Sequence, residues 1–335
     1  MISKYYLGLD IGGTKSAVVL ASLPENPADE KPLLHDRFVL PTGSAASPRA
    51  LVDALLQAAR RMLTGLGPDQ TVVGTGISCG SPLDSRRGLI LSPPNLPGWD
   101  QIPITEWVRD ATGLPAWLLN DADAGALAEW RFGAGHGCQN MVFLTFGTGF
   151  GAGLILNGRL YSGIDDGAGE IGHVRISPTG PVGYGKAGSL EGFCSGGGIA
   201  QLARLMVLEK TQMGERVAFC DRAGGPEQLS ARLVGEAADD GDPLAKEILA
   251  VSGRYLGQGL AILLDLLNPE RIVIGSIFAR SQRWIWPAAD EVLKRESLAR
   301  TYRRCQVLPA QLGEQTGDLA AVSIALEGEK GALPQ

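Results

Sequence analysis

The sequence begins one pattern twice, and this repeat limits the possible folds more than any other feature. Residues 5–20 read YYLGLDIGGTKSAVVL, and residues 141–161 read MVFLTFGTGFGAGLILNGRLY. In each copy a glycine-rich turn joins two apolar segments rich in β-forming residues, a pattern that is typical of a β-hairpin. The two copies predict an α/β protein with two domains, each of which opens with a glycine-turn hairpin.

The length of the chain and its helix signals agree with two domains. At 335 residues the chain exceeds the size at which one hydrophobic core usually stops growing. Helices are predicted to begin at Ser47-Pro48 and at Asp242-Pro243, where a capping residue precedes an apolar periodic segment. We expect an N-terminal domain over residues 1–118, a C-terminal domain over 119–310, and a C-terminal helix within 311–335 that packs back on the N-terminal domain.

Charge and hydropathy exclude several classes of function. The net charge is −6, and no block of lysine and arginine could neutralise a row of phosphates, so nucleic acid is not an expected partner. No apolar run approaches the ~20 residues of a membrane span, and the stretch before Asp10 is too short for a signal-peptide core. We therefore expect a cytoplasmic protein that does not bind membranes. The cysteines form no C-x-x-C pair and are expected to be free thiols: Cys79, Cys138, Cys194, Cys220 and Cys305.

The first turn, DIGGTK at residues 10–15, holds the parts of a phosphate site. Its glycines leave backbone N–H groups unobstructed, next to the hydroxyl of Thr14 and the ammonium of Lys15. The carboxylate of Asp10 could hold a hydrated Mg²⁺. One such hairpin alone is more often a structural turn, but the second turn, GTGFGAG at 147–153, changes this balance. Two turns suit a nucleotide whose phosphates lie in a cleft between two domains.

Two other nucleotide motifs match by spacing but fail on context. The second turn fits the G-x-G-x-x-A form of the dinucleotide fingerprint, which needs a helix directly after the glycines. Here the next residues, LILNGRLY, read as a strand and a hairpin turn. Residues 180–186 have P-loop spacing, but Ala187 stands where a metal-binding hydroxyl is required. Neither motif predicts a nucleotide site.

Asp121 is the candidate catalytic base. It follows the short apolar strand 117–119 and precedes ADAGALAEWRFG, which has helical periodicity and a final glycine. A carboxylate at a helix N-terminus is stabilised as the anion and could accept a hydroxyl proton, although an aspartate there also fits a plain N-cap. His173 taken alone fits a structural histidine equally well. Residues whose amides, carboxylates or ring nitrogens could bind sugar hydroxyl groups favour the catalytic interpretation: Asn95, Asn120, Glu170, His173 and Glu191.

These residues resemble a known family, the bacterial ROK group of sugar kinases, open reading frames and repressors. The shared motifs run almost from end to end: LDIGGTK at 9–15, PNLPGW at 94–99, NDADAGALAE at 120–129, FGTGFGAGLILNGRLYSG at 146–163, AGEIGH at 168–173, LEGFCSG at 190–196 and NPERIVIGS at 268–276. The resemblance implies an actin-like or hexokinase-like fold with a nucleotide and sugar cleft between domains. It also implies ATP with Mg²⁺, and transfer of the γ-phosphate to a hexose hydroxyl, usually at the 6-position.

The resemblance assigns roles to individual positions. It implies that Asp121 is the base. We expect Asp10 to hold the Mg²⁺ through water, as its place beside the first turn suggests. The implied sugar ligands are Asn95, Asn120, Asp121, Glu170, His173 and Glu191. The expected nucleotide contacts are Asp10, Gly12, Gly13, Thr14, Lys15, Thr148, Gly149 and Gly275.

Three departures from the family pattern are visible. Asp123 stands where the family commonly has asparagine, and Ser276 replaces a glycine near the nucleotide. The family's zinc site uses a histidine and three cysteines, and the three cysteine positions hold Val182, Tyr184 and Ser189. Because a tetrahedral zinc needs about four N and S ligands, no structural zinc is expected. The loop should instead be fixed by packing, with Val182 and Tyr184 as apolar contacts.

The first functional hypothesis is a kinase for the 6-hydroxyl group of glucose. A kinase for N-acetylglucosamine, N-acetylmannosamine or another hexose is the alternative, because epimers differ by one hydroxyl group that no motif records. A sugar-responsive repressor is disfavoured, since Asp10 leaves no room for a preceding helix-turn-helix. A non-catalytic sugar sensor is disfavoured because the base and both turns are intact. These assignments rest partly on family analogy. Because the family contains dimers and tetramers, this chain could also form a homodimer.

Overall fold

The structure is a computed structural model that describes residues 3–24 and 31–333. The chain divides into two compact units, which are described one at a time. Their bounds are Met1–Gln139, Gly153–Ala168 and Gln311–Gln335 for the first unit, and Asn140–Ala152 and Gly169–Ala310 for the second. The boundary predicted after residue 118 differs from this division, because the helix that follows it packs within the first unit. Residues 1 and 335, the outer ends of the predicted domains, lie outside the described residues.

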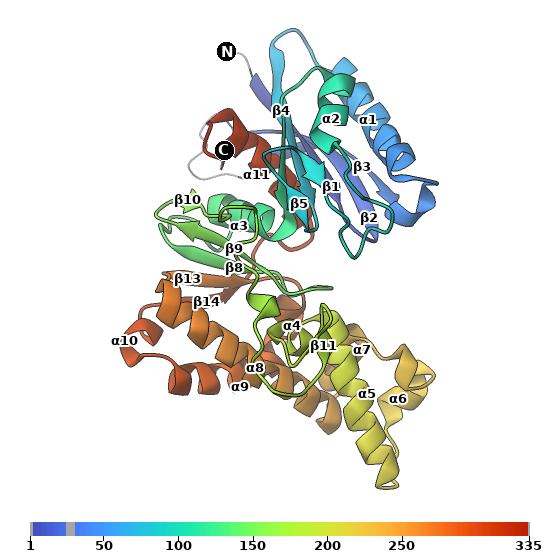
Figure 1. Cartoon of the computed structure of the whole chain (residues 1–335), viewed down its shortest axis with the longest axis vertical. Coiled ribbons are helices and arrows are strands. Elements are labelled where there is room, and N and C mark those ends of the chain that lie inside the picture. Colours follow the sequence, from blue (N-terminus) through green and yellow to red (C-terminus); the bar gives the residue numbers. More distant parts are fainter. Residues whose placement is uncertain (1–2, 25–30, 334–335) are drawn as a thin grey trace. The chain divides into compact units, whose positions relative to one another are not determined.

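The first unit is built on a five-stranded sheet in the order β3-β2-β1-β4-β7 (Figure 1). β1 and β2 form the predicted antiparallel hairpin, in which Leu9 pairs with Val18, while β1, β4 and β7 run parallel. Register places the end of β1, at Ile11, beside Cys79 of β4, which in turn pairs with Asn120 of β7. Three carboxyl ends therefore meet at one edge of the sheet. The strand bounds are β1 (Ser3–Ile11), β2 (Lys15–Ser22), β3 (Leu33–Pro41), β4 (Gln70–Cys79) and β7 (Ala116–Asn120).

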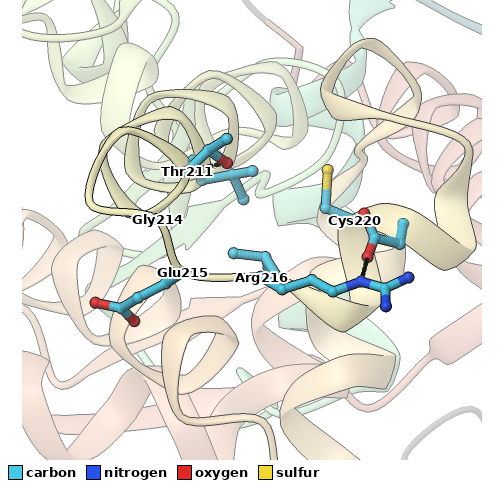
Figure 2. Close-up of a pocket in the computed structure, with 8 residues that line it drawn as sticks. Thr211, Gly214, Glu215, Arg216 and Cys220 are labelled. Carbon is cyan, nitrogen blue, oxygen red and sulfur yellow. Dashed lines mark hydrogen bonds and ion pairs between the residues drawn. The ribbon is translucent and has the colours of Figure 1, made fainter.

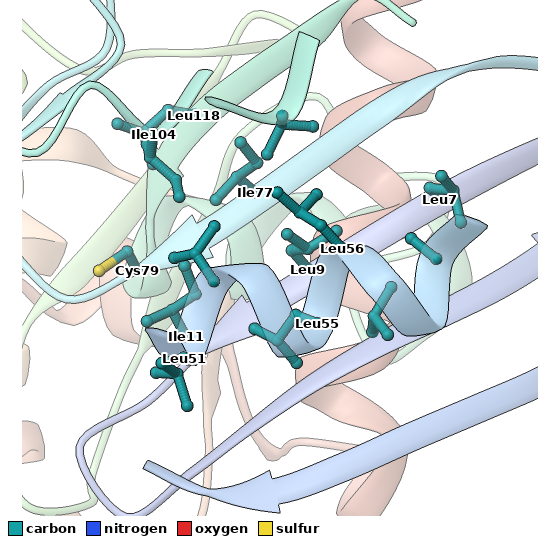
Figure 3. Close-up of a cluster of buried hydrophobic side chains, with 14 of the residues drawn as sticks. Leu7, Leu9, Ile11, Leu51, Leu55, Leu56, Ile77, Cys79, Ile104 and Leu118 are labelled. Carbon is teal, nitrogen blue, oxygen red and sulfur yellow. The ribbon is translucent and has the colours of Figure 1, made fainter. Parts of the chain in front are cut away.

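One face of this sheet is covered by α1 (Pro48–Thr64) and α2 (Ile104–Thr112). Alternate residues of β1, including Leu7 and Leu9, point toward this face and pack with apolar side chains of both helices (Figure 3). α1 begins as predicted, with the side chain of Ser47 capping its first turn. The largest apolar cluster of the first unit thus fixes β1, which leads directly into the first glycine turn.

The other face of the sheet carries α11 (Thr316–Glu329), which was predicted as a helix within 311–335. A Cβ atom at Gly76 of β4 would lie 2.0 Å from the carbonyl oxygen of Ala321, and one at Gly8 of β1 would lie 2.9 Å from the Ala321 Cβ. Glycines on the strands and alanines on the helix therefore allow close approach of backbone to backbone. α11 also packs against α3 (Asp121–Phe132).

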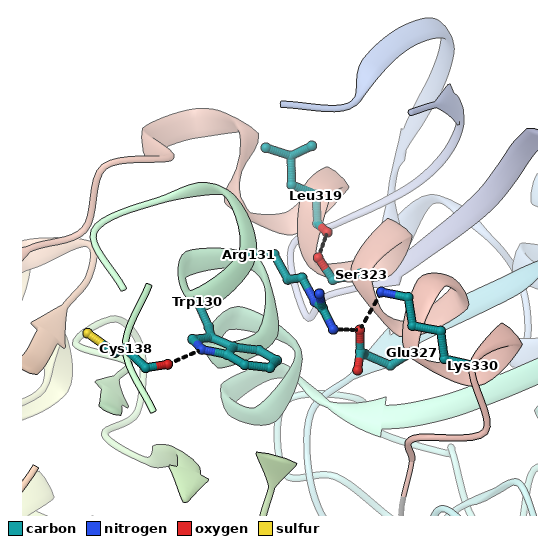
Figure 4. A network of polar contacts seen from close by, with 7 residues as sticks. All are labelled: Trp130, Arg131, Cys138, Leu319, Ser323, Glu327 and Lys330. Atoms are coloured by element: carbon teal, nitrogen blue, oxygen red, sulfur yellow. Dashed lines mark hydrogen bonds and ion pairs between the residues drawn. The ribbon is translucent and has the colours of Figure 1, made fainter. Parts of the chain in front are cut away.

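A buried carboxylate ties α3 to the C-terminal segment. Glu129 is fully buried, and its Oε1 accepts hydrogen bonds from the backbone N–H groups of Gln311 at 2.9 Å and Leu312 at 3.0 Å. Two residues further on, Arg131 of α3 forms an ion pair with Glu327 of α11 (Figure 4). Because a buried charge is costly unless it is hydrogen-bonded, these contacts hold the C-terminal helix on the first unit.

Residues 153–168 add a short hairpin to the first unit. β9 (Ala152–Leu156) pairs antiparallel with β10 (Arg159–Leu160) around the predicted Asn157-Gly158 turn. Both turn residues have positive φ, 53° and 70°, as a tight type I′ turn requires. Gly153 faces α3, where a Cβ atom would lie 2.3 Å from the carbonyl oxygen of Ala122. A second small hairpin pairs β5 (Leu83–Asp84) with β6 (Leu89–Ile90).

The second unit contains three parallel strands with β13 in the middle. In register, Ile272 of β13 pairs with Val142 of β8 on one side and with Val307 of β14 on the other. Ile272, Val273 and Ile274 of β13 are fully buried, as the apolar sequence IVI predicts for a central strand. The strands are β8 (Met141–Leu144), β13 (Arg271–Ile274) and β14 (Gln306–Pro309). The helices are α4 (Leu190–Phe193), α5 (Gly196–Gln212), α6 (Ala218–Ala223), α7 (Ala231–Asp239), α8 (Pro243–Leu267), α9 (Ile277–Glu296) and α10 (Ala299–Tyr302).

The long helix α8 starts at the predicted cap, Asp242, and packs closely on α9. A Cβ atom at Gly253 would lie 2.3 Å from the carbonyl oxygen of Ile285, and one at Gly257 would lie 2.4 Å from that of Ala289. These two glycines therefore admit the backbone of α9.

Two predictions concern the chain as a whole. All five cysteines are free thiols, as predicted, and four of them are buried. Within residues 3–24 and 31–333, no helix has the length and hydropathy needed to cross a membrane.

Candidate active site

The first glycine turn closes the β1–β2 hairpin in the first unit. The Gly12 N–H donates to the carbonyl oxygen of Lys15 at 3.2 Å. Thr42 binds the turn from behind: its Oγ1 donates to the Gly12 carbonyl at 2.6 Å, and its N–H donates to the Thr14 carbonyl at 3.0 Å. The carbonyl groups are thus occupied inside the protein, while Gly13 and Thr14 are exposed. This geometry suits a turn that offers N–H groups to an anion.

Asn95 lies directly against this turn. A Cβ atom at Gly13 would lie 2.8 Å from the Asn95 carbonyl oxygen and 3.0 Å from its Cβ, and one at Gly80 would lie 3.2 Å from its Oδ1. The proline-rich loop that carries Asn95 is irregular, as predicted, and Asn95 itself is exposed. The structure therefore brings one predicted sugar ligand next to the predicted phosphate turn.

Asp10, at the end of β1, is surrounded by other acidic groups of the first unit. Burial, followed by the charges of Asp121 and Asp318, raises the pKa of its carboxyl to about 6, while Lys15 and a hydrogen bond with Ser78 act in the opposite direction. Asp318 was not predicted as a site residue, because it lies in α11 and belongs to no recognisable motif. Crowded carboxylates of this kind fit a hydrated divalent cation, whose charge would relieve their repulsion.

Asp121 is the first residue of α3 but does not cap the helix. The cap is Asn120, whose Oδ1 accepts a hydrogen bond from the Asp123 N–H at 2.8 Å, so the plain N-cap interpretation of Asp121 does not hold. Asp121 remains open to solvent. Desolvation by the surrounding protein raises the pKa of its carboxyl, and hydrogen bonds with the backbone N–H groups of Ala122 and Asp121 only partly oppose this. The net direction is opposite to that expected from the helix N-terminus alone, and it makes the carboxylate a stronger base than a free aspartate.

Asp123, the departure from the family's asparagine, forms a buried cluster with Asn120. Its Oδ2 accepts hydrogen bonds from the Asn120 Nδ2 at 3.1 Å and from the Ser162 Oγ at 2.7 Å. Its Oδ1 is buried and has no hydrogen-bond partner among the described residues. Burial raises the pKa of Asp123 to about 7. Asn120 thus uses its amide oxygen and one N–H inside the protein, and its role as a sugar ligand depends on the remaining N–H.

The second glycine turn lies in the second unit and contacts Glu191. The Thr145 N–H donates to the Gly151 carbonyl at 2.9 Å, which continues the hairpin pattern and agrees with rejection of the dinucleotide fingerprint. Glu191, in α4, accepts a hydrogen bond from the Phe150 N–H through Oε2 at 3.0 Å. A Cβ atom at Gly149 would lie 3.0 Å from the same oxygen. A second predicted sugar ligand therefore lies against a predicted phosphate turn.

Glu170 and His173 occupy the segment that packs on this second turn. Both are exposed, at the two ends of a short 3₁₀ segment. Gly172 between them faces the turn so closely that a Cβ atom would lie 1.8 Å from the Phe150 carbonyl oxygen and 3.4 Å from the Glu191 Cβ. Within the second unit, the three predicted sugar ligands thus gather beside the glycine turn.

Gly275 and Ser276 follow β13 and lie near the same turn. The Gly275 N–H donates to the Leu144 carbonyl at 2.9 Å, and a Cβ atom at Gly147 would lie 3.8 Å from the Ser276 Oγ. Ser276 has φ 53° and ψ −107°, a conformation that L residues other than glycine rarely adopt. Backbone strain of this kind is often found at functional sites, which favours a role for this segment next to a nucleotide.

The loop that replaces the family's zinc segment is not fixed as predicted. Val182 and Tyr184 are 48% and 64% exposed, so the prediction that they anchor the loop by apolar packing is wrong. The loop is instead held by backbone hydrogen bonds, such as those from Ile176 and Ser177 to the Gly188 carbonyl. Among the described residues, no group of three or more His, Cys, Asp or Glu side chains could hold a metal ion.

A surface hollow of about 260 Å³ lies elsewhere in the second unit, between α5 and α6 (Figure 2). Exposed ion pairs border it, including Arg216 with Asp221 at 2.6 Å. None of the predicted site residues lines this hollow, so it takes no part in the candidate site. Its lining residues are Val207, Thr211, Gly214, Glu215, Arg216, Val217, Cys220 and Asp221.

Comparison with known proteins places the chain in a family. Residues 6–327 match the ROK family. The chain belongs to the ROK family. A glucokinase from Halalkalibacterium halodurans is 31% identical to it over 95% of this chain and 93% of that protein. An N-acetylmannosamine kinase from Escherichia coli is 32% identical over 97% of this chain and 99% of that protein.

Solved structures agree with this membership. A ROK family glucokinase from Streptomyces griseus, solved in complex with glucose and AMPPNP, has a TM-score of 0.74 and 28% identity, covering 97% of this chain and 100% of that chain. A ROK family transcriptional regulator, a homologue of the Escherichia coli MLC protein, has a TM-score of 0.83 and 26% identity, covering 98% of this chain and 79% of that chain. These similarities confirm the predicted α/β fold class of the actin-like type.

Proposed function

We propose that this member of the ROK family is an ATP-dependent hexose kinase that phosphorylates the 6-hydroxyl group of glucose, with Asp121 as the general base. The observation that carries the proposal is the state of Asp121. Its neighbour Asn120 caps α3, which leaves the Asp121 carboxylate exposed at the sheet edge where β1, β4 and β7 end. The glucokinases from Halalkalibacterium halodurans and Streptomyces griseus support glucose as the substrate.

Asp121 would accept the proton of the sugar hydroxyl as that oxygen attacks the phosphorus atom. Its raised pKa suits this role, because a carboxylate with a higher pKa is a stronger base. In phosphoryl transfer most of the acceleration comes from positioning and charge neutralisation, so the other residues act by holding the sugar in line. The proposed sugar ligands are Asn95, Asn120, Glu170, His173 and Glu191.

The two glycine turns would hold the phosphates by their backbone N–H groups. In the first turn Gly13 and Thr14 are exposed beside Lys15, and in the second turn Thr148 and Gly149 lie next to Glu191. ATP would supply the phosphoryl group, and Mg²⁺ near Asp10 would neutralise its developing charge. We propose that Asp10 holds this ion through water, since its crowding by Asp121 and Asp318 fits a hydrated cation.

A kinase for N-acetylmannosamine is the second candidate. The Escherichia coli N-acetylmannosamine kinase is as similar in identity to this chain as the glucokinases are, which favours testing it directly. The two sugars differ in a bulky acetamido group at C2. A site that hydrogen-bonds one substituent at that carbon discriminates strongly against the other, so turnover numbers should separate the two functions clearly.

The test is an assay of ADP release with glucose, mannose, fructose, N-acetylglucosamine and N-acetylmannosamine, with Mg²⁺ present. We expect the highest kcat/KM with glucose. A higher value with N-acetylmannosamine would favour the second candidate, and no turnover with any sugar would contradict a kinase function.

Asp121→Asn tests the proposed base. The change keeps the size of the side chain and removes its basicity, so kcat should fall at least ~100-fold, the low end of a general base's contribution. Asp110→Asn is the matched control, because Asp110 is an exposed aspartate on α2 that is not assigned to the site. Near-normal turnover of a folded Asp121→Asn variant would remove Asp121 from the mechanism.

A further inference from the structure

Gln201, on α5, binds both backbone groups of one residue in the loop that replaces the zinc segment. Its Oε1 accepts a hydrogen bond from the Val182 N–H at 2.9 Å, and its Nε2 donates to the Val182 carbonyl at 2.8 Å. A longer contact of 3.4 Å joins Nε2 to the Gly197 carbonyl at the start of the same helix. An amide side chain thus pairs with Val182 as a neighbouring β-strand would.

The hairpin geometry explains why Val182 needs such a partner. β11 (Val182–Gly183) pairs antiparallel with β12 (Lys186–Ala187), and Val182 stands opposite Ala187. The Gly188 N–H donates to the Pro181 carbonyl at 3.0 Å, so the hydrogen-bonded position lies one residue away. In an antiparallel pair these positions alternate, and the N–H and C=O groups of Val182 therefore point outward from the hairpin. Gln201 provides the hydrogen-bond partners for these two outward-pointing groups.

The hairpin contacts the proposed sugar ligand Glu191. A Cβ atom at Gly183, next to Val182, would lie 2.8 Å from the Glu191 Cβ and 2.6 Å from the Gly192 backbone nitrogen. On the other strand, the Lys186 Nζ donates to the His173 carbonyl at 2.8 Å. A shift of this hairpin would therefore displace the backbone that carries two proposed sugar ligands.

The residues at the family's cysteine positions do not fit a zinc ion. Val182 has no donor atom in its side chain and Tyr184 is largely exposed. The Ser189 Oγ is already used, since it accepts a hydrogen bond from the Gly192 N–H at 3.2 Å and caps α4. A tetrahedral site of N and S ligands cannot be assembled from this set. The loop must therefore be held by hydrogen bonds and not by zinc ligation.

We propose that Gln201 is a positioning residue that fixes the β11–β12 hairpin and, through the hairpin, Glu191. Gln201 thereby takes the role that zinc has in relatives with the cysteines. The side chain does this by binding the backbone of Val182, whose position in the sequence corresponds to one of those cysteines. The effect on catalysis rests on the proposed function, because it assumes that Glu191 binds the sugar. The effect on the loop does not depend on the proposed function.

The test compares Gln201→Ala with Gln212→Ala, a control that removes an exposed glutamine from the end of the same helix. Hydrogen exchange of residues 174–189 should become about tenfold faster in Gln201→Ala, as loss of about 1.4 kcal/mol of local stability implies. The KM for glucose should rise severalfold while the KM for ATP stays within twofold. Exchange is measured without substrate, so failure of the kinase proposal would not change the exchange result expected for Gln201→Ala.

Gln201→Glu provides a second readout that a loss of packing would not produce. A protonated glutamic acid keeps one acceptor and one donor for Val182, whereas the carboxylate keeps only acceptors and faces the Val182 carbonyl. Exchange of 174–189, corrected for intrinsic rates, should match the native protein at pH 4 and approach that of Gln201→Ala at pH 8. Unchanged exchange in Gln201→Ala, or one zinc per chain by elemental analysis, would overturn the proposal.

Discussion

The two glycine turns arise from one sequence pattern, yet they are stabilised in different ways. In the first unit the turn is short, it is flanked by the charged residues Asp10 and Lys15, and Thr42 holds its carbonyl groups. In the second unit residues 147–153 contain no charged side chain, and the turn is held by Glu191 and by the start of α5. A glycine repeat therefore predicts where backbone is exposed, but not what supports it.

This difference suggests that the two glycine turns contribute to catalysis in different ways. Three aspartates whose pKa values are raised mainly by desolvation lie in the first unit: Asp10, Asp121 and Asp123. We infer that the first turn works mainly through charge, by means of a cation and the base. The second turn has only N–H groups and a hydroxyl to offer, so we infer that it works mainly through geometry. Substitutions in and beside the two turns separate these roles.

The largest contrast is expected between Asp10→Asn and Thr148→Val. Removal of the Asp10 charge should lower kcat at least ~100-fold, because charge neutralisation dominates phosphoryl transfer. Thr148→Val removes one neutral hydroxyl and keeps the backbone donors, so a loss of about tenfold or less is expected. Both values come from ADP release at saturating glucose over a titration of Mg²⁺. Equal losses would show that the two turns do not differ in this way.

A smaller contrast is expected between Gly13→Ala and Gly149→Ala. The new Cβ would lie 2.8 Å from the Asn95 backbone oxygen at Gly13, but 3.0 Å from the end of the Glu191 carboxylate at Gly149. A backbone oxygen in a proline-rich loop cannot move as easily as a carboxylate, so the KM for ATP should rise about tenfold or more in Gly13→Ala and less in Gly149→Ala. A larger rise of the KM for ATP in Gly149→Ala would contradict the idea that the Glu191 side chain moves away from the new Cβ.

The sequence predicted the elements that carry strong local signals. Ser47, Asp242 and the Asn157-Gly158 turn have side chains or backbone preferences that specify a cap or a turn, and each one is confirmed. α5 and α9 were not predicted. α5 begins with three consecutive glycines, and α9 contains Pro287, so local preference opposes a helix that tertiary packing supports.

The candidate site was predicted less completely than the fold. Motif residues such as Asn95 and Glu191 lie beside the glycine turns, and the resemblance implies that they bind the sugar. Asp318 and Gln201 carry no sequence signal, because each acts on a partner far away in the chain. The apolar contacts expected of Val182 and Tyr184 failed since the hairpin exposes both side chains. Long-range backbone hydrogen bonds leave no pattern in one sequence.

Asp123→Asn is expected to change stability in a pH-dependent way. In the folded protein the pKa of Asp123 is about 7, against an ordinary value of 3.8. As pH rises between these values, the unfolded chain loses this proton before the folded chain does, so stability falls, and the full penalty is present above pH 7. Asparagine avoids the penalty and keeps an oxygen for Ser162. The variant should be more stable by about 1 to 3 kcal/mol at pH 8 and by little at pH 4, as measured by urea unfolding. An equal change at both pH values would contradict the raised pKa.

The smallest effect is expected from Ser276→Gly, next to the second turn. Ser276 has φ 53° and ψ −107°, and a glycine adopts this conformation without the Cβ clash that strains serine. Relief of the strain should exceed the entropy cost of glycine and raise stability by about 1 kcal/mol, or roughly 2 to 4 °C in Tm. Ser297→Gly is the control, because Ser297 ends the same helix with φ −101° and gains nothing from glycine. If the second turn works through geometry and Ser276 contributes no charge, kcat should stay within about threefold of the native value. A large loss of kcat with unchanged stability would instead assign the Ser276 hydroxyl a direct role at the nucleotide.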